Sequence, residues 1–384
     1  MCMNSKTHTY LPSEWHTNMK ILDALDTPKL VYNTSIIEKN INIFTTALNN
    51  NVDAYYSVKA NNNQHILDYI YKKGLGFEVA SMLEIERLKT LGVPSNQIIF
   101  GAPVKISEHI RRAYKLGVLT YAVDSLTEIE KVSALAPYSK IYIRVDTSND
   151  GATWSLNEKF GIPEEDVLEL AKSAISMKLR PIGLTFAMGW NNGNAKLWGE
   201  NLGRIVRLTK QLIMEGIHLQ FVDLGGGFPS HLVEKQQVFN EISKAVNPLI
   251  HELKTSVNVK TIAEPGSFIV SDAGVMLTSI IAKRKKNDKW WLFLDTGIMQ
   301  GFPWIHSNLQ YAITSLHTSS NPKMTPFIIT GPTCDSHDIF NTACMLDINI
   351  KIGDKVIIFP AGGYIESSTA YSGFMLPQSF IISE

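Results

Sequence analysis

The chain has 384 residues, 45% hydrophobic and 19% charged, and its 36 basic and 36 acidic residues cancel. This ordinary globular balance gives no electrostatic reason to expect nucleic acid or an anionic membrane as a partner. Three cysteines without CxxC spacing predict neither a disulfide framework nor a metal site, and they suit a reducing cytoplasm. The N-terminal segment lacks the apolar core of a signal peptide, and no run is long enough to span a membrane, so we expect a soluble protein.

Eight short apolar runs alternate with amphipathic segments in the first two thirds of the chain. This alternation predicts parallel strands joined by helices. Eight such units within roughly 210–240 residues fit a (β/α)8 barrel better than an open doubly wound sheet, which remains the alternative. The runs are 54–60, 76–81, 98–103, 119–125, 140–146, 181–188, 221–227 and 258–266.

After about residue 275 the strand candidates follow one another without helices, which predicts a mainly-β domain. The strand candidates are 289–295, 325–331, 348–359 and 378–383. The polar stretch 306–325 is typical of a long surface loop. We therefore expect an N-terminal segment (1–28) that packs with the β domain, a barrel (29–270) and a C-terminal β domain (271–384).

Lys59 ends the first predicted strand, in YYSVKAN. The C-terminal ends of barrel strands form the active face, where burial could lower the pKa of the amine and make it a Schiff-base nucleophile. A lysine that is simply solvated at a strand end is the more common outcome for a single lysine.

Two further strand ends carry residues suited to a phosphorylated ring. Gly225, Gly226 and Gly227 in DLGGGFP expose successive backbone N–H groups that can cradle a phosphate, although a tight turn alone would also explain them. Glu264 in AEPGSF could face a pyridine nitrogen and make the ring an electron sink, or be a capping or solvated glutamate.

Three residues of the β domain are also candidates. Cys334 and Asp335 in GPTCDSHD could act as a proton donor and as the partner of a substrate amine, although a buried cysteine that only packs is the commoner case. Tyr364 in AGGYIESSTAYSGF could contact a ring or a phosphate, or simply pack in the core.

In their order, these blocks resemble the barrel-type (fold type III) pyridoxal phosphate (PLP) decarboxylases, which include ornithine, arginine and diaminopimelate decarboxylases. The similarity runs from about residue 29 to the C-terminus, through YYSVKANNN, GFEVASMLEIE, FGAPVK, VDS, EKFG, VDLGGGFP, AEPGSFIVSDAG, GPTCDSHD and AGGYIESSTAYSGF. The resemblance implies a PLP barrel followed by a β domain, assembled as a homodimer with shared active sites that act on a small amino acid.

The resemblance also implies roles for individual residues. Lys59 carries PLP, Glu264 pairs with the pyridine nitrogen, and Asp335 of the neighbouring subunit holds a substrate amine. Cys334 of that subunit returns a proton to Cα after CO2 leaves. The remaining cofactor contacts implied are Gly225, Gly226, Gly227, Gly266, Ser267 and Tyr364.

Three family residues that contact the cofactor are replaced in this chain. The histidine over the ring and the serine at the phosphate are Ala187 and Trp190 in FAMGWNN, and the arginine of EPGR is Ser267. The indole of Trp190 and the hydroxyl of Ser267 are the groups that could compensate for these losses.

The substrate end differs as well, because GFPWIHSN lacks the acidic residue that holds the distal amine in polyamine-forming relatives. Losing one of two anionic partners weakens recognition of a free ammonium by about 1.5–3 kcal/mol. The Cys-Asp pair resembles the ornithine/lysine branch. We therefore expect a basic amino acid or a conjugated derivative such as the citryl-ornithine of siderophore synthesis, with Trp304, His306 and Asn308 lining its pocket.

Two other functions compete with this interpretation. A catalytically silent homologue that binds a regulatory partner would explain Ala187, Trp190 and Ser267, but it gives no physical reason to retain Lys59 together with Glu264. A racemase of the same fold would need a tyrosine base where this chain has Cys334.

Overall fold

The computed structural model describes residues 11–148, 150–153, 159–230, 234–302, 305, 311–317 and 319–368. The chain divides into two compact units. Of the described residues, one unit contains those up to Ile37 together with 270–368, and the other, the barrel unit, contains Glu38–Ile269. Among the described residues, no helix is both long enough and apolar enough to cross a membrane.

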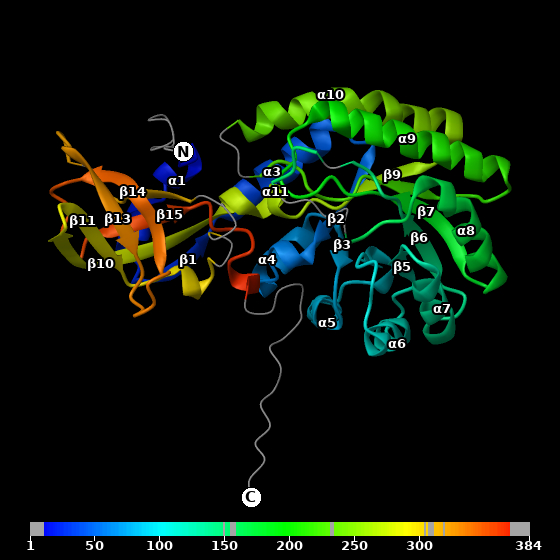
Figure 1. Ribbon diagram of the computed structural model, residues 1–384, viewed down its shortest axis with the longest axis horizontal. Helices are drawn as coiled ribbons and strands as arrows, with labels where there is room; N and C mark the ends of the chain where they lie inside the picture. The colour runs from blue at the N-terminus through cyan, green and yellow to red at the C-terminus, as the bar shows by residue number, and fades with distance from the viewer. Residues whose placement is uncertain are drawn as a thin grey trace, which may run out of the picture. The chain divides into compact units, whose positions relative to one another are not determined.

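The barrel unit contains a closed barrel of eight parallel strands, so the prediction of a (β/α)8 barrel is confirmed and the open sheet is excluded (Figure 1). Each of the eight predicted runs contributes one strand. The strands are β2 (Val52–Ser57), β3 (Gly76–Val79), β4 (Ile98–Phe100), β5 (Thr120–Val123), β6 (Lys140–Arg144), β7 (Arg180–Thr185), β8 (Phe221–Asp223) and β9 (Lys260–Ala263).

Helices follow the strands and surround the barrel, and α9 packs against α10 (Figure 1). Ser81 and Ser125 each begin a helix, because their hydroxyls accept the N–H of Glu84 and Glu128 three residues later. The helices are α3 (Thr34–Ala47), which precedes β2, then α4 (Gln64–Lys72), α5 (Met82–Thr90), α6 (Ser107–Lys115), α7 (Leu126–Leu135), α8 (Val167–Ser176), α9 (Ala195–Met214), α10 (Lys235–Glu252) and the short α11 (Ser267–Val270).

An aromatic cluster packs between the barrel and its outer helices. Phe228 stacks on Trp198 at a ring-centroid distance of 4.6 Å and meets Phe44 edge-on at 5.0 Å. Phe239 contacts Phe268 at 4.7 Å. Phe228 and Phe268 directly follow Gly227 and Ser267 in the sequence. The cluster therefore fixes the backbone on which two of the predicted site segments stand.

The other unit contains a seven-stranded sheet, which confirms the predicted mainly-β domain. The order is β12-β15-β10-β11-β13-β14, and β1 pairs with β10. The elements are α1 (Ser13–His16), α2 (Met19–Ala24), β1 (Lys29–Tyr32), β10 (Gly274–Lys286), β11 (Lys289–Leu294), β12 (Ala312–Ser315), β13 (Met324–Thr330), β14 (Ile339–Asp347) and β15 (Lys355–Phe359).

Some predictions for this unit were wrong. The expected loop over 306–325 contains β12, whose polar sequence hides a single buried side chain, Ile313. Of the predicted strand 348–359, only the second half forms β15. Strand β14 was not predicted because Asn341 and Thr342 interrupt its apolar pattern. The candidate at 378–383 lies outside the described residues.

Candidate functional site

Lys59 lies in a 3-10 turn, Val58–Ala60, directly after β2. Its Nζ is 2.7 Å from Glu78 Oε2, and Ser57 Oγ donates to the same oxygen at 2.7 Å. The Glu78 side chain is only 2% exposed, whereas that of Lys59 is 31% exposed. Lys59 is therefore held at the strand ends by a buried carboxylate instead of extending into solvent.

Glu264 follows β9, and its carboxyl group lies near that of Asp223, the last residue of β8. Asp223 is fully buried and accepts hydrogen bonds from Thr185 Oγ1 at 2.8 Å and from the Gly225 N–H at 2.9 Å. Burial raises the pKa of Asp223 to about 6. Two neighbouring carboxyl groups disfavour each other's charged form, so both favour the protonated form more than ordinary carboxyls do.

The pKa of Glu264 is raised well above its usual range. Burial is the main cause, the charges of Asp223 and Glu78 add to it, and Lys59 opposes it. By solvent exposure Glu264 is partly buried. Near the amine of Lys59 the site therefore has a carboxyl group that favours its protonated form and can share that proton with a ring nitrogen.

Arg144 ends β6, and its guanidinium lies 5.1 Å from the ring centroid of Phe160. Its Nη2 is buried and has no hydrogen-bond partner in the part of the chain that the structure describes. Buried guanidinium hydrogens normally have acceptors. This nitrogen is thus available to an oxygen of a bound ligand.

The glycine run after β8 meets the chain that follows β7 very closely. A Cβ on Gly225 would lie 2.2 Å from the Phe186 carbonyl oxygen, and one on Gly227 would lie 1.9 Å from that of Gly189. Both glycines also have positive φ, 64° and 93°. A tight turn therefore explains these two glycines without any ligand.

The same run also offers hydrogen-bond donors. For the N–H groups of Gly226 and Gly227, no acceptor is found among the described residues. Both residues are partly exposed. Two successive amides of this kind suit an anionic group such as a phosphate. Steric need and phosphate binding are thus compatible at this loop.

Trp190 and Ser267, two of the replaced family residues, contact each other. Trp190 Nε1 donates to Ser267 Oγ at 3.3 Å, and both residues are buried. Ala187, the third replacement, provides no ring. Whether Trp190 replaces the stacking of the family's histidine stays a prediction.

The predicted residues of the β domain belong to the other unit. Cys334 follows β13 and is exposed, which excludes a buried packing role for its thiol. Asp335 Oδ1 accepts the His337 N–H at 2.8 Å and lies 2.9 Å from His337 Nδ1. Tyr364 is buried and has a φ of 61°. Trp304, His306 and Asn308 lie outside the described residues.

Three residues of the site, Glu78, Arg144 and Asp223, were not predicted from the sequence. Each lies at or beside the C-terminal end of a barrel strand, the position that drew attention to Lys59 and Glu264. A search for every charged residue at these strand ends would have found them.

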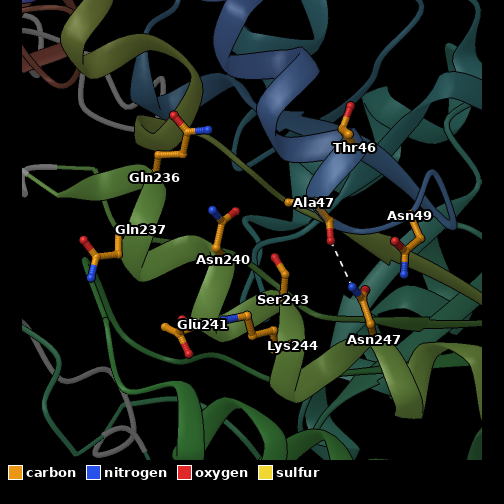
Figure 2. Close-up of a pocket in the computed structure, with 10 residues that line it drawn as sticks. All are labelled: Thr46, Ala47, Asn49, Gln236, Gln237, Asn240, Glu241, Ser243, Lys244 and Asn247. Carbon is orange, nitrogen blue, oxygen red and sulfur yellow. Dashed lines mark hydrogen bonds and ion pairs between the residues drawn. The ribbon is translucent and has the colours of Figure 1, made fainter.

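A groove of about 650 Å³ lies elsewhere in the barrel unit, between the end of α3 and one face of α10 (Figure 2). Its polar groups already serve the fold. Asn247 Nδ2 donates to the Ala47 carbonyl at 2.9 Å, and Lys244 pairs with Glu241 at 2.8 Å. None of the predicted catalytic or cofactor residues lines this groove.

Comparisons with known proteins agree with the geometry at the strand ends. Residues 34–271 match the family model for the pyridoxal-dependent decarboxylase, pyridoxal binding domain. The chain is 31% identical to a lysine/ornithine decarboxylase of Selenomonas ruminantium over 94% of this chain and 91% of the relative. A crystal structure of a lysine decarboxylase from the same organism aligns with a TM-score of 0.83 and 29% identity, covering 98% of this chain and 95% of that one. Antizyme inhibitor 2 of Xenopus laevis is 27% identical over 84% of this chain and 74% of its own.

Proposed function

The chain belongs to the pyridoxal-dependent decarboxylase family, and from this premise we propose that it removes the α-carboxylate of a basic amino acid or of an N-conjugated derivative. The products are an amine and CO2. The observation that carries the proposal is made at the strand ends of one barrel. There the Lys59 amine pairs with Glu78, and Asp223 and Glu264 add two further carboxyl groups after β8 and β9.

The residues at the strand ends fit the cofactor. Arg144 Nη2 and the amides of Gly226 and Gly227 are donors that lack acceptors among the described residues, as a ligand rich in anionic oxygen requires. Glu264 is the residue that would pair with the ring nitrogen. When bound, pyridoxal phosphate supplies a ring that takes up the electron pair left when CO2 departs.

The chain's own residues control the protons. The pKa of Glu264 is raised by burial and by the charge of Asp223, so Glu264 would hold a proton that it can share with the ring nitrogen. Lys59 Nζ donates to Glu78 Oε2, so Glu78 would hold the free lysine amine in position after β2. Ser57 fixes the orientation of the Glu78 carboxylate by donating to the same oxygen.

We assign Cys334 and Asp335 to the substrate side of the reaction. In the homodimer that we propose, the loop after β13 of one subunit completes the active site of the other. Cys334 is exposed, as a proton donor delivered to a neighbouring subunit must be. Asp335 would hold the distal amine or its substituent, while His337 holds the Asp335 carboxylate in position. We place this enzyme in the cytoplasm.

Two observations bear on the substrate. One supports a free basic amino acid, and the other supports an acylated derivative of one. The lysine/ornithine decarboxylase of Selenomonas ruminantium supports a basic amino acid. The absence of an acidic residue from the segment GFPWIHSN supports a substrate whose distal amine carries an acyl group, such as citryl-ornithine. The α-amino acid end is common to both.

A CO2-release screen of the PLP-loaded protein tests the function directly. Ornithine, lysine, diaminopimelate and citryl-ornithine are offered separately, and the amine product is identified by mass spectrometry. Stoichiometric CO2 and amine from one of them support the proposal. PLP binding without CO2 from any of the four would favour a silent homologue, such as the antizyme inhibitor to which the chain is also similar.

The cysteine assignment has its own test. Replacing Cys334 by alanine removes the proposed acid and should lower turnover about a hundredfold, the lower range for general acid catalysis. PLP affinity should stay unchanged. Cys344→Ala, at the other cysteine that the structure describes, is the matched control. Equal turnover of the Cys334→Ala variant and the wild type would remove Cys334 from the mechanism.

A further inference from the structure

Two replaced family residues, Trp190 and Ser267, stand 77 positions apart in the sequence but are joined by a buried hydrogen bond. Trp190 is 8% exposed and Ser267 is 5% exposed. An indole N–H can only donate, so the Ser267 oxygen is the acceptor. The hydroxyl hydrogen of Ser267 is therefore left to donate to something else.

Backbone hydrogen bonds join the three segments that contain Trp190, residues 225–227 and Ser267, which together are called the wall below. The Asn192 N–H donates to the Gly227 carbonyl at 2.9 Å, and the Glu264 N–H donates to the Gly225 carbonyl at 2.8 Å. The segments that contain Trp190, the glycine run and Ser267 thus form one surface. Phe228 and Phe268, which follow two of these segments, are anchored in the aromatic cluster. The donors on this wall are positioned before any ligand arrives.

The direct donors on this wall are neutral. They are the amides of Gly226 and Gly227 and the hydroxyl of Ser267. Lys235 is buried beside α11, but its Nζ donates to Asn40 Oδ1 at 3.0 Å and to the Phe268 carbonyl at 2.7 Å. Its Nζ also lies 4.5 Å from the centroid of the Phe268 ring, so the fold itself already engages this ammonium.

We propose that Trp190 and Ser267 act as one coupled contact for the cofactor's phosphate, and that each replacement is tolerated only because the other is present. An arginine at position 267 would bring a guanidinium, which only donates, against the indole N–H, and would bury its charge beside a large ring. A serine at position 190 without the arginine would leave Ser267 without its donor. The family's serine and arginine, and this chain's tryptophan and serine, are two self-consistent sets.

The proposal rests on the cofactor of the proposed function, and a binding experiment separates the two. PLP and its unphosphorylated form, pyridoxal, are titrated separately into the cofactor-free protein, and Kd is measured from the visible band of the lysine-bound cofactor. The proteins are the wild type, Ser267→Ala, Trp190→Phe and the double variant. Thermal unfolding without cofactor confirms that each variant is folded.

Ser267→Ala should raise the Kd for PLP about tenfold, the loss expected for one hydrogen bond to a charged group. Trp190→Phe should have a comparable effect, because Ser267 then loses the contact that orients it. The Kd of the double variant for PLP should be no higher than that of Ser267→Ala alone, because the two residues act through one contact. The Kd for pyridoxal should be the same in all four proteins.

A second pair of variants tests the mutual requirement. Ser267→Arg alone should weaken PLP binding, whereas Trp190→Ser combined with Ser267→Arg should restore it to the wild-type Kd or below. Additive single effects, an equal loss of pyridoxal affinity, or tight PLP binding by Ser267→Arg alone would each overturn the coupling. A wild type that binds no PLP would instead refute the proposed function.

Discussion

Two sides of the barrel mouth differ in how far they keep the family pattern. The proton-handling side contains Lys59, Glu78, Asp223 and Glu264, and its residues match the family wherever the resemblance assigns a role. The phosphate side keeps its glycines but has lost a serine and an arginine. Proton chemistry needs one group of a defined charge at one place, whereas a phosphate can be held by several sets of donors. Phosphate binding can therefore be met by more combinations of residues than proton transfer can.

Replacing the ionisable carboxyl group of Glu264 should produce the largest effect. Glu264→Gln cannot hold a proton at the ring nitrogen, so turnover should fall about a thousandfold, within the range for general acid–base groups. Steady-state kinetics of the loaded enzyme measure this loss. Glu252→Gln, which breaks an exposed ion pair with Lys210, is the matched control and should be silent. A loss below about tenfold would contradict the assignment of Glu264.

On the proposed phosphate side, a substitution in the glycine run should act on the backbone and lower the stability of the fold. Gly227→Ala places a Cβ 1.9 Å from the Gly189 carbonyl oxygen and should lower the free energy of unfolding by about 3 kcal/mol. Gly216 has a similar φ of 82° with nothing within 4 Å, so Gly216→Ala should cost only about 1 kcal/mol. Urea unfolding compares the two. Equal losses would show that the close approach at Gly227 is unimportant.

Glu84 tests whether buried carboxyls near Lys59 make stability depend on pH. Burial raises its pKa to about 7 from an ordinary 4.5, and its Oε1 has no partner among the described residues. The folded state therefore keeps a proton that the unfolded state loses, so stability falls as pH rises from 4.5 to 7. Glu84→Gln cannot ionise and should be about 2 kcal/mol more stable than the wild type at pH 8, with no gain at pH 4.5.

The control for Glu84 is Glu86→Gln, an exposed position of the same helix. It should leave the pH dependence of unfolding unchanged. A Glu84→Gln variant with the wild-type slope between pH 4.5 and 7 would show that Glu84 is ionised in the folded state.

Asp223 should have the smallest effect, and mainly on pH dependence. Asp223→Asn removes a charge that raises the pKa of Glu264, so Glu264 stays ionised to lower pH. The weakening of PLP binding at acid pH, where Glu264 takes up a proton, should move to lower pH in this variant. The Kd for PLP at pH 8 should change by less than about tenfold. PLP titrations from pH 5 to 8 measure how Kd depends on pH, with Asp68→Asn as an exposed control. The same pH dependence of Kd in Asp223→Asn and the wild type would show that Asp223 does not influence the pKa of Glu264.

The barrel could be predicted because its signal is repeated. Eight apolar runs separated by helices are hard to explain by another fold, and each run contributed a strand. The β domain gave weaker signals. Strand β12 has one buried residue, Ile313, and β14 is interrupted by polar residues, so neither stands out before its pairing partner is known.

The site divides in the same way. The positions of Lys59 and Glu264 at strand ends could be predicted from the sequence, and the structure places both there. The pairing of Trp190 with Ser267 could not, because residues 77 positions apart meet only when strand ends converge at the barrel mouth. Side-chain contacts of this kind depend on the closed sheet, which no local pattern encodes.

The central claim is that Lys59 carries the cofactor. PLP is added to the purified protein, the lysine-bound cofactor is reduced with borohydride, and the modified peptide is located by mass spectrometry for wild type, Lys59→Ala and the exposed-lysine control Lys72→Ala. The account predicts a visible band before reduction and a label on Lys59 in wild type and Lys72→Ala, with neither in Lys59→Ala. A label on another lysine, or an unchanged band in Lys59→Ala, would contradict it.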